Sequence, residues 1–158
     1  MQTSEFKAQT RSLNIRLLTK TDHLDWLRMR CELWPNANKN EQRHEIQIFG
    51  NRDSYKVWIA EALDGQVVAF LEGQTCNRAD GCLSDRIFFI EGWWVDQKYR
   101  RQGVGHALMR AAEEWAKTNG CQELASDTWL DNDPSHAAHL SFGFKEVDRN
   151  ITYRKELK

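Results

Sequence analysis

The stretch Arg100-Arg101-Gln102-Gly103-Val104-Gly105 decides the fold of this sequence. It follows the apolar residues 87–95 and opens residues 104–119, whose apolar spacing predicts a helix. The first N–H groups of a helix have no partner within it, and the helix dipole adds partial positive charge there. The two glycines of the stretch lack a Cβ atom, so an anion can come close to the main chain, and its two arginines add positive charge. A strand, a short basic connection and a helix start therefore predict an anion site.

Two common phosphate-binding loops do not fit this stretch. No Lys-Ser or Lys-Thr pair follows the glycines, as a P-loop requires, and no third glycine occurs before Gly120, which excludes the Rossmann fingerprint. Taken alone, the stretch also fits a basic turn that binds nothing. The choice between these interpretations depends on the elements on either side.

Length and charge narrow the class of protein. The chain has 158 residues, which predicts one domain, residues 1–158, in which residues 1–12 form a loosely attached N-terminal extension. A net charge of −1 and a pI near 6.5 give no general attraction to nucleic acid or to an anionic membrane. No segment approaches the roughly 18 apolar residues of a membrane span, and residues 1–14 lack the apolar core of a signal peptide. Neither nucleic acid nor a membrane is an expected partner.

The cysteines indicate a reducing compartment, and the histidines give no sign of a metal site. The four cysteines contain no Cys-x-x-Cys pair, and the five histidines are scattered without metal-ligand spacing. These features predict a cytoplasmic thiol protein without a bound metal.

Hydrophobic periodicity and turn residues predict a mixed order of strands and helices. The expected elements are a strand at residues 13–18, helices at about 22–34 and 41–49, a hairpin of strands at 55–62 and 66–73, a loop at 74–86, a strand at 87–95, a helix at 104–119, a strand at 121–126, a helix at about 132–142 and a last strand at 151–157. In the first helix the apolar residues at helical spacing are Leu24, Leu27, Cys31 and Trp34. A crossover helix as long as residues 104–119 joins parallel strands. The result is an α/β fold with a mixed sheet, in the order β-α-α-β-β-β-α-β-α-β(-β).

The glycine loop and this order resemble the GCN5-related N-acetyltransferases. The stretch at residues 100–105 is similar to their Arg/Gln-x-x-Gly-x-Gly/Ala pyrophosphate loop, and Phe142-Gly143-Phe144 stands where they have Gly-Phe after the last helix. The resemblance covers nearly the whole chain and implies their fold, with splayed parallel central strands, and acetyl-CoA as cosubstrate. The cofactor-binding residues that it implies are Trp93, Trp94, Val95, Arg100, Arg101, Gln102, Gly103, Val104, Gly105, His106 and Asn132.

Within that superfamily the chain is similar to the aminoglycoside 6′-N-acetyltransferases. The residues that carry this resemblance are Leu33-Trp34-Pro35, Phe89-Ile90-Glu91-Gly92, Gly120-Cys121, Ala125-Ser126-Asp127-Thr128 and Tyr153-Arg154-Lys155. The drug contacts that it implies are Trp34, Glu91, Asp127 and Asp148, with Arg78 near the place of a family aromatic. An arginine repels a polycation, so either Arg78 turns away or the substrate range differs. The resemblance also implies a homodimer.

These residue types suit a polyamine carried on sugar rings, which needs carboxylates for its ammonium groups and flat apolar surfaces for its rings. Glu91 interrupts an apolar strand, where an unpaired charge is costly, although it also fits a carboxylate that points to solvent. Asp127 ends a strand beside the cofactor strand, where ligands usually lie, or it caps a loop. Trp34 lines the drug site or belongs to the core, and Asp148 also fits a surface pair with Arg149.

Amide formation requires a neutral amine, and a nearby carboxylate can take the proton, so Glu91 and Asp127 are expected to be catalytic. A backbone N–H of residues 93–95 is expected to stabilise the oxyanion, and Gly92 predicts a bulge that separates this strand from its parallel neighbour. Many family members have a tyrosine four residues before the Gly of Gly-Phe, and here that residue is His139. His139 is either the acid that protonates the departing thiolate or a half-buried helix residue without a catalytic role.

The sequence therefore predicts an acetyl-CoA-dependent N-acetyltransferase that acetylates the 6′-amine of aminoglycoside antibiotics by direct attack and thereby confers resistance. One alternative is an acetyltransferase for another small polyamine or a peptide amine, because an acidic cluster favours a polycation without naming it. The other is a CoA-binding sensor without turnover, against which the intact glycine loop and Glu91 argue.

Overall fold

A five-stranded mixed sheet organises the chain, and the computed structural model describes residues 13–158. The strands lie in the order β1-β2-β3-β4-β5. They are β1 (Leu13–Leu17), β2 (Tyr55–Ala62), β3 (Val67–Cys76), β4 (Ile87–Val95) and β5 (Glu123–Ser126). The helices are α1 (His23–Leu33), α2 (Lys39–Phe49), α3 (Val104–Thr118) and α4 (Asp133–Ser141), with the short 3₁₀ turns η2 (Lys20–Asp22) and η3 (Gln97–Tyr99). The predicted extension at residues 1–12 lies outside the described residues.

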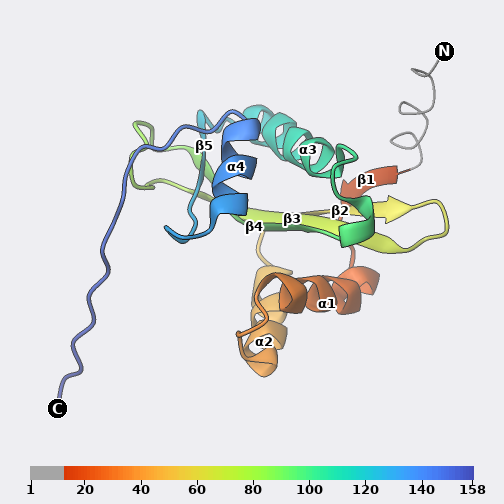
Figure 1. Cartoon of the computed structure of the whole chain (residues 1–158), viewed down its shortest axis with the longest axis horizontal. Helices are drawn as coiled ribbons and strands as arrows, with labels where there is room; N and C mark the ends of the chain where they lie inside the picture. The colour runs from red at the N-terminus through yellow and green to blue at the C-terminus, as the bar shows by residue number, and fades with distance from the viewer. Residues whose placement is uncertain (1–12) are drawn as a thin grey trace.

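Different helices cover the two faces of the sheet (Figure 1). Helices α3 and α4 lie over one face, and α1 and α2 lie over the other (Figure 1). Phe88 and Leu108 belong to the buried cluster on the α3 side, and Trp26 and Phe70 to the cluster on the α1 side. Successive strand residues point to opposite faces, so the central strands supply both clusters and are almost continuously apolar.

The parallel strands β4 and β5 are paired over only part of β4. Residues 87–90 pair with residues 123–126, and beyond that point, among residues 13–158, β4 has no neighbour on that side. On its other side β4 pairs with β3, where Glu72 faces Gly92 and Gly73 faces Ile90, so Glu91 is an extra, bulged residue. The predicted parallel crossover, the bulge and the separation of the strands are confirmed.

Helix α1 lies where the sequence predicts, and Leu27 is buried as expected, but the rest of its buried face is different. Leu24 is 81% exposed, whereas Trp26, Met29 and Arg30 are buried. The expected face was chosen from apolar residues alone. It therefore missed Arg30, whose charge pairs with Glu72 inside the protein.

The predicted last strand at residues 151–157 is wrong for the single chain. After α4 the chain turns at Gly143, where φ is +89°. Residues 145–158, here called the C-terminal arm, first pass the loop at residues 80–82, where Asn150 Nδ2 donates to Asp80 Oδ2 at 2.8 Å, and then extend away from the body (Figure 1). Within this arm Ile151, Tyr153 and Leu157 are 78%, 90% and 86% exposed. A strand needs a neighbouring strand for its main-chain N–H and C=O groups, and the arm has none in the described part of its own chain.

Candidate active site

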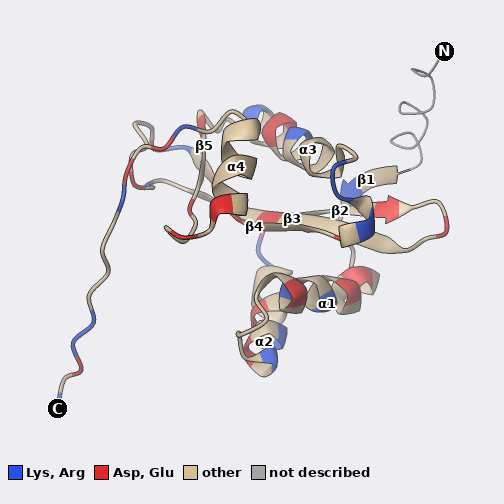
Figure 2. Ribbon diagram, viewed as in Figure 1, with Lys and Arg blue, Asp and Glu red and all other residues tan. Residues whose placement is uncertain are grey.

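The expected anion-binding loop forms at the start of α3. Gly103 is the N-cap of this helix with a φ of +82°, and no side chain caps the helix. Arg101 also has a positive φ, +63°, which is uncommon for a residue with a side chain. This tight turn leaves the first N–H groups of α3 open to an anion. Figure 2 shows Lys and Arg along the loop that leads into α3.

Two side chains of the loop hold its shape. Arg100 Nε donates to the carbonyl oxygen of Val95 at 2.8 Å, and Gln102 Nε2 donates to the carbonyl oxygen of Lys98 at 2.8 Å. These bonds tie the loop to the end of β4 and to η3. The side chain of Arg101 is exposed, so its charge is accessible to a ligand.

Gly105 also has a packing role that the sequence does not predict. It is helical, and a Cβ atom on it would lie 3.3 Å from Cζ of Phe142. The His106 ring packs edge-on against the same phenylalanine, with ring centroids 4.7 Å apart. Gly105 therefore allows the end of α4 to pack against the first turn of α3.

Residues 93–95 of β4 lie on a free strand edge. The N–H of Asp96 donates to the carbonyl oxygen of Val68 at 2.8 Å, which places it on the β3 side. Because N–H groups alternate in direction along a strand, those of Trp93 and Val95 point away from β3, to the side from which β5 has diverged. Main-chain groups are therefore available there for hydrogen bonds to a ligand.

Glu91 and Asp127 lie where β4 and β5 part. Ile90 and Ser126 are the last residue pair of the two strands, and each carboxylate residue follows directly. Both residues are exposed, and Gln74 Nε2 donates to Glu91 Oε1 at 2.7 Å. Neither carboxylate forms a salt bridge within the described chain. Both can therefore receive a cation from solution.

His139 reaches the same place from α4. Its Nδ1 atom is 2.7 Å from the carbonyl oxygen of Ser135, and its Nε2 atom is 3.0 Å from Ser126 Oγ. A carbonyl oxygen only accepts, so Nδ1 carries the proton. The single hydroxyl hydrogen of Ser126 has two acceptors within reach, the carbonyl oxygen of Ile90 at 3.2 Å and Nε2 of a neutral His139, and can bond only one of them at a time. Burial lowers the pKa of His139, which favours this neutral form, while the hydrogen bond to the Ser135 carbonyl oxygen and, more weakly, the charge of Asp127 act in the opposite direction. The Trp93 ring packs edge-on against the imidazole, with centroids 4.6 Å apart.

Trp34 follows α1 and is half-buried, so it is not a fully enclosed core residue. A Cβ atom on Gly92 would lie 2.9 Å from Cζ2 and Cη2 of its ring. The guanidinium of Arg30 lies over the indole, with Cζ 4.9 Å from the ring centroid. Trp34 is therefore fixed beside the bulge that carries Glu91.

Three other predicted site residues, Arg78, Asp148 and Asn132, lie apart from the group formed by Glu91, Asp127 and His139. Arg78 is exposed in the loop between β3 and β4. Asp148 lies on the C-terminal arm, where its Oδ1 atom accepts from the N–H of Arg149 at 2.7 Å. Asn132 caps α4, because its Oδ1 atom accepts from the N–H of Ser135 at 3.2 Å. No hydrogen bond or salt bridge among residues 13–158 links Arg78 or Asp148 to the two carboxylates.

The sequence did not point to Ser126 or to Glu72. Ser126 Oγ lies 3.2 Å from the carbonyl oxygen of Ile90 and 3.0 Å from His139 Nε2, so its hydroxyl stands between β4 and α4. A signal for Glu72 was present, because this carboxylate directly follows the apolar residues 67–71. An unpaired charge is costly inside an apolar strand. Glu91 is exposed and does not bear this cost, whereas Glu72 is buried and is paired with Arg30.

Within residues 13–158, no group of three or more His, Cys, Asp or Glu side chains is arranged to hold a metal ion. None of the helices described there combines the length and the apolar character needed to cross a membrane.

Comparison of the sequence with known proteins identifies close relatives. The chain is 44% identical over 146 residues to the aminoglycoside N(6′)-acetyltransferase type 1 of Klebsiella aerogenes, a match that covers 90% of this chain and 96% of that protein. It is 38% identical to the protein of the same name from Serratia marcescens, with 86% of this chain and 94% of that protein covered.

Solved structures agree with the sequence matches. The aminoglycoside N-acetyltransferase AAC(6')-Iy in complex with CoA has a TM-score of 0.85 at 32% identity, over 92% of this chain and 95% of that one. AAC(6')-Iy in complex with the bisubstrate analog CoA-S-monomethyl-acetylneamine has a TM-score of 0.85 at 32% identity, over 92% and 99%. The acetyltransferase (GNAT) family matches residues 22–144, from the start of α1 to the segment after α4. With its anion-binding loop, its parting strands and these matches, the chain belongs to the GNAT acetyltransferase family.

Proposed function

We propose that this enzyme transfers the acetyl group of acetyl-CoA to the 6′-amine of aminoglycosides and thereby confers resistance to them. The observation that carries the proposal is the placement of Glu91 and Asp127, which both follow the last residue pair of β4 and β5. Two exposed carboxylates without a cationic partner in the described chain suit the ammonium groups of such a drug. The relatives in Klebsiella aerogenes and Serratia marcescens bear the name of this activity.

The loop and the free edge of β4 fit acetyl-CoA, which supplies the thioester carbon that the amine attacks. The uncapped N-terminus of α3 fits the pyrophosphate, because Gly103 leaves the main chain uncovered and Arg101 adds positive charge. Main-chain groups on the free edge fit the pantetheine amides, as when a peptide adds to a sheet. An N–H of Trp93 or Val95 can stabilise the negative charge that develops on the thioester oxygen.

Glu91 and Asp127 prepare the amine in this proposal. The attacking nitrogen must be neutral, yet a free amine is mostly protonated near neutral pH. A carboxylate attracts the ammonium form and takes its proton, directly or through water. Asp127 extends from the strand parallel to the cofactor strand, so it is the more direct contact to the 6′-amine, and Glu91 assists from the bulge.

We assign to His139 the return of a proton to the departing thiolate. In its neutral form Nε2 carries no proton, so His139 has to take up a proton before it can donate one. Asp127, which takes the proton of the amine in this proposal, also favours the imidazolium form of His139 that donates to the thiolate. The alternative is a structural role, in which the ring only packs against Trp93.

Release of free thiol from acetyl-CoA tests the proposed reaction. We expect turnover with kanamycin and tobramycin, and a kcat/KM at least about tenfold lower with spermidine and with a peptide amine, since tenfold corresponds to about 1.4 kcal/mol of transition-state binding. A preference for spermidine or the peptide would identify another amine acetyltransferase. Binding of acetyl-CoA without thiol release on any amine would identify a CoA-binding sensor.

We also propose that the enzyme works in the cytoplasm. All four cysteines are free thiols, which suits a reducing compartment.

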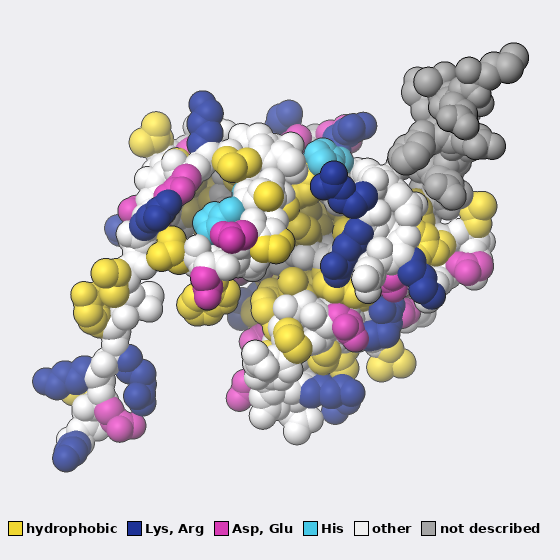
Figure 3. Space-filling model, viewed as in Figure 1, with side chains coloured by type: hydrophobic (Ala, Val, Ile, Leu, Met, Phe, Trp, Pro, Cys, Tyr) yellow, Lys and Arg dark blue, Asp and Glu magenta, His cyan; other side chains and the backbone are white. Residues whose placement is uncertain are grey.

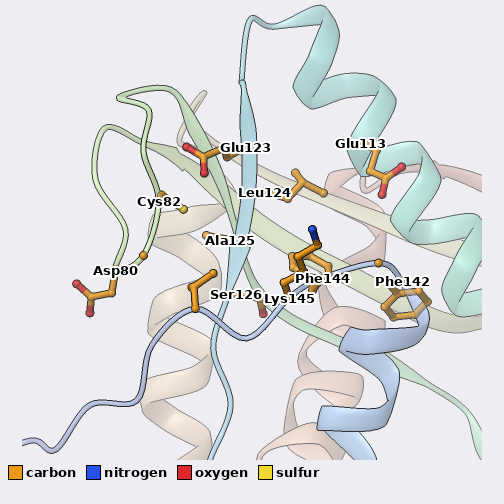
Figure 4. Close-up of a pocket in the computed structure, with 13 residues that line it drawn as sticks. Asp80, Cys82, Glu113, Glu123, Leu124, Ala125, Ser126, Phe142, Phe144 and Lys145 are labelled. Atoms are coloured by element: carbon orange, nitrogen blue, oxygen red, sulfur yellow. The ribbon is translucent and has the colours of Figure 1, made fainter.

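We propose that the enzyme is a homodimer in which the C-terminal arms are exchanged. β5 is an edge strand of the sheet, and a groove of about 360 Å³ runs beside it (Figure 4). The groove is lined by residues 80–82, by residues 123–126 of β5 and by residues from 142 to 147 (Figure 4). Hydrophobic side chains are visible along the arm in Figure 3. The exposed hydrophobic residues of the arm are Val147, Ile151, Tyr153 and Leu157, all at odd-numbered positions. The main-chain groups on the free edge of β5 and those of the arm both lack partners within one chain. When two copies exchange arms, the arm of each copy can pair with the β5 edge of the other.

Charge on the arm is expected to separate the two copies. The double substitution Ile151→Asp and Tyr153→Asp places carboxylates where the arm would enter the groove, so light scattering should report a monomer instead of a dimer. The control is Leu63→Asp, which changes a leucine of comparable exposure, 86%, in the β2–β3 turn and should leave the dimer intact. A monomeric wild type, or a dimer that survives the double substitution, would contradict exchange.

A further inference from the structure

A buried carboxylate lies directly opposite the bulge. Glu72 in β3 faces Gly92 at the register shift, and its side chain is 1% exposed. Its Oε2 atom accepts from Trp26 Nε1 at 2.6 Å, and its Oε1 atom accepts from Arg30 Nη1 at 2.7 Å. Burial raises the pKa of this carboxyl, and its partners, chiefly the Arg30 guanidinium, act in the opposite direction. The strand residue that faces the bulge is therefore one half of a buried ion pair.

Arg30 uses its whole guanidinium in this interior network. Its side chain is 4% exposed, and its Nε atom donates to Gln42 Oε1 at 2.6 Å. Its Nη2 atom pairs with Glu45, which also belongs to α2. Each nitrogen of the planar guanidinium thus has an acceptor, on β3 or on α2, and together these bonds fix the orientation of the plane.

Trp34 stacks on this fixed plane. Its main chain no longer has helical dihedral angles, with φ of −121° and ψ of 71°, although its N–H still donates to the carbonyl oxygen of Arg30. Contacts outside the helix therefore help to set the position of the ring. One side of the indole meets the Arg30 guanidinium at 4.9 Å, and its edge meets Gly92. The indole is therefore held between the guanidinium and the bulge that carries Glu91.

We infer that Arg30 and Glu72 are positioning residues for the aminoglycoside, because together they hold the Trp34 ring against the bulge, where it lines the drug site. This inference rests on the proposed function. It gives a reason for a buried ion pair at this place, since apolar residues of similar size often pack an interior at least as stably. Neither residue touches the reacting atoms, so their effect is on binding of the drug.

Arg30→Lys separates positioning from charge. Lysine keeps the positive charge beside Glu72 but has no planar fork to bond Gln42 and Glu45 and to stack on Trp34. We expect the KM for kanamycin to rise by about tenfold and the KM for acetyl-CoA to change by less than about twofold. Calorimetric titration with kanamycin should show the same loss of affinity without turnover.

Glu72→Gln is the milder second variant, because it keeps the shape of the side chain while weakening its hold on Arg30. It is expected to raise the kanamycin KM by about threefold, with kcat nearly unchanged. The matched control is Asp22→Asn, which removes another buried carboxylate charge, with a side chain 8% exposed and paired with Arg16 before the start of α1. The control should lower the melting temperature and leave both KM values unchanged.

A double-mutant cycle with Trp34→Ala decides whether Arg30 acts through the indole. In that background Arg30→Lys should add no further rise in the kanamycin KM, because the ring it positions is gone. A further tenfold rise, or an unchanged kanamycin KM in folded Arg30→Lys and Glu72→Gln, would overturn the inference. If the wild type itself fails to bind and acetylate kanamycin, the proposed function fails instead.

Discussion

Asp127→Asn is expected to lower kcat/KM for kanamycin by roughly 10²- to 10⁴-fold, the range that a general base contributes. Asparagine keeps the size of the side chain but can neither neutralise the ammonium group nor take its proton. Asp127 directly follows the last pair of β4 and β5 and is exposed, so its carboxylate is free to meet the amine. Steady-state kinetics of thiol release measures the loss, and calorimetric binding of acetyl-CoA should remain nearly unchanged.

Glu91→Gln is the matched comparison, because it removes the second carboxylate of the same site in the same way. We expect a loss in kcat/KM no larger than that of Asp127→Asn, since the bulged Glu91 is already bonded by Gln74 and supports the amine less directly. A carboxylate that only binds the ammonium group should raise KM, whereas a base should lower kcat. If both variants acetylate kanamycin at the wild-type rate from about pH 6 to about pH 9, neither carboxylate serves as the base.

The anion loop and the crossover could be predicted from the sequence because they depend on local features. Gly103 adopts the positive φ that only glycine takes easily, and α3 follows it with regular apolar spacing. A crossover helix of this length leaves the flanking strands parallel. The bulge at Gly92 was predictable for a related reason, since a glycine inside a strand has no side chain to pack.

The buried face of α1 could not be predicted in the same way. Leu24 and Arg30 both occur in α1, yet the leucine is exposed and the arginine is buried. The arginine is buried because its acceptors, Glu72 on β3 and Gln42 on α2, come from distant parts of the chain. Such a network is set by tertiary packing, so helical spacing alone wrongly predicts that Leu24 is buried and gives no sign that Arg30 is.

The C-terminal arm shows a second limit of local patterns. Alternation at residues 151–157 describes a segment that can pair as a strand, but it does not say with which edge. In the single chain the arm pairs with no strand, and the hydrophobic side chains at residues 151, 153 and 157 are exposed. The element order of the described residues therefore ends at α4, because residues 151–157 have no strand to pair with in their own chain.

Gly103→Glu is expected to weaken acetyl-CoA binding by at least about 100-fold, equivalent to about 2.8 kcal/mol. Two effects contribute to this loss. A side chain at a φ of +82° costs about 1 to 2 kcal/mol, which the loop can relieve only by leaving the anion-binding conformation. A carboxylate about 4 Å from a phosphate charge adds repulsion of about 4 kcal/mol at an effective dielectric constant of about 20. Calorimetric titration with CoA measures the combined effect, and circular dichroism confirms that the variant is folded.

Gly103→Gln separates the two effects, because glutamine has the shape of glutamate and the same backbone strain without the charge. We expect Gly103→Gln to lose only about tenfold in affinity, so that charge accounts for the remainder. The difference between the two variants should shrink in salt, since the screening length falls from about 10 Å at 0.1 M to about 3 Å at 1 M. Equal losses in both variants would mean that the phosphates do not lie at the start of α3. Unchanged affinity in folded Gly103→Glu would mean that the cofactor binds elsewhere on the molecule.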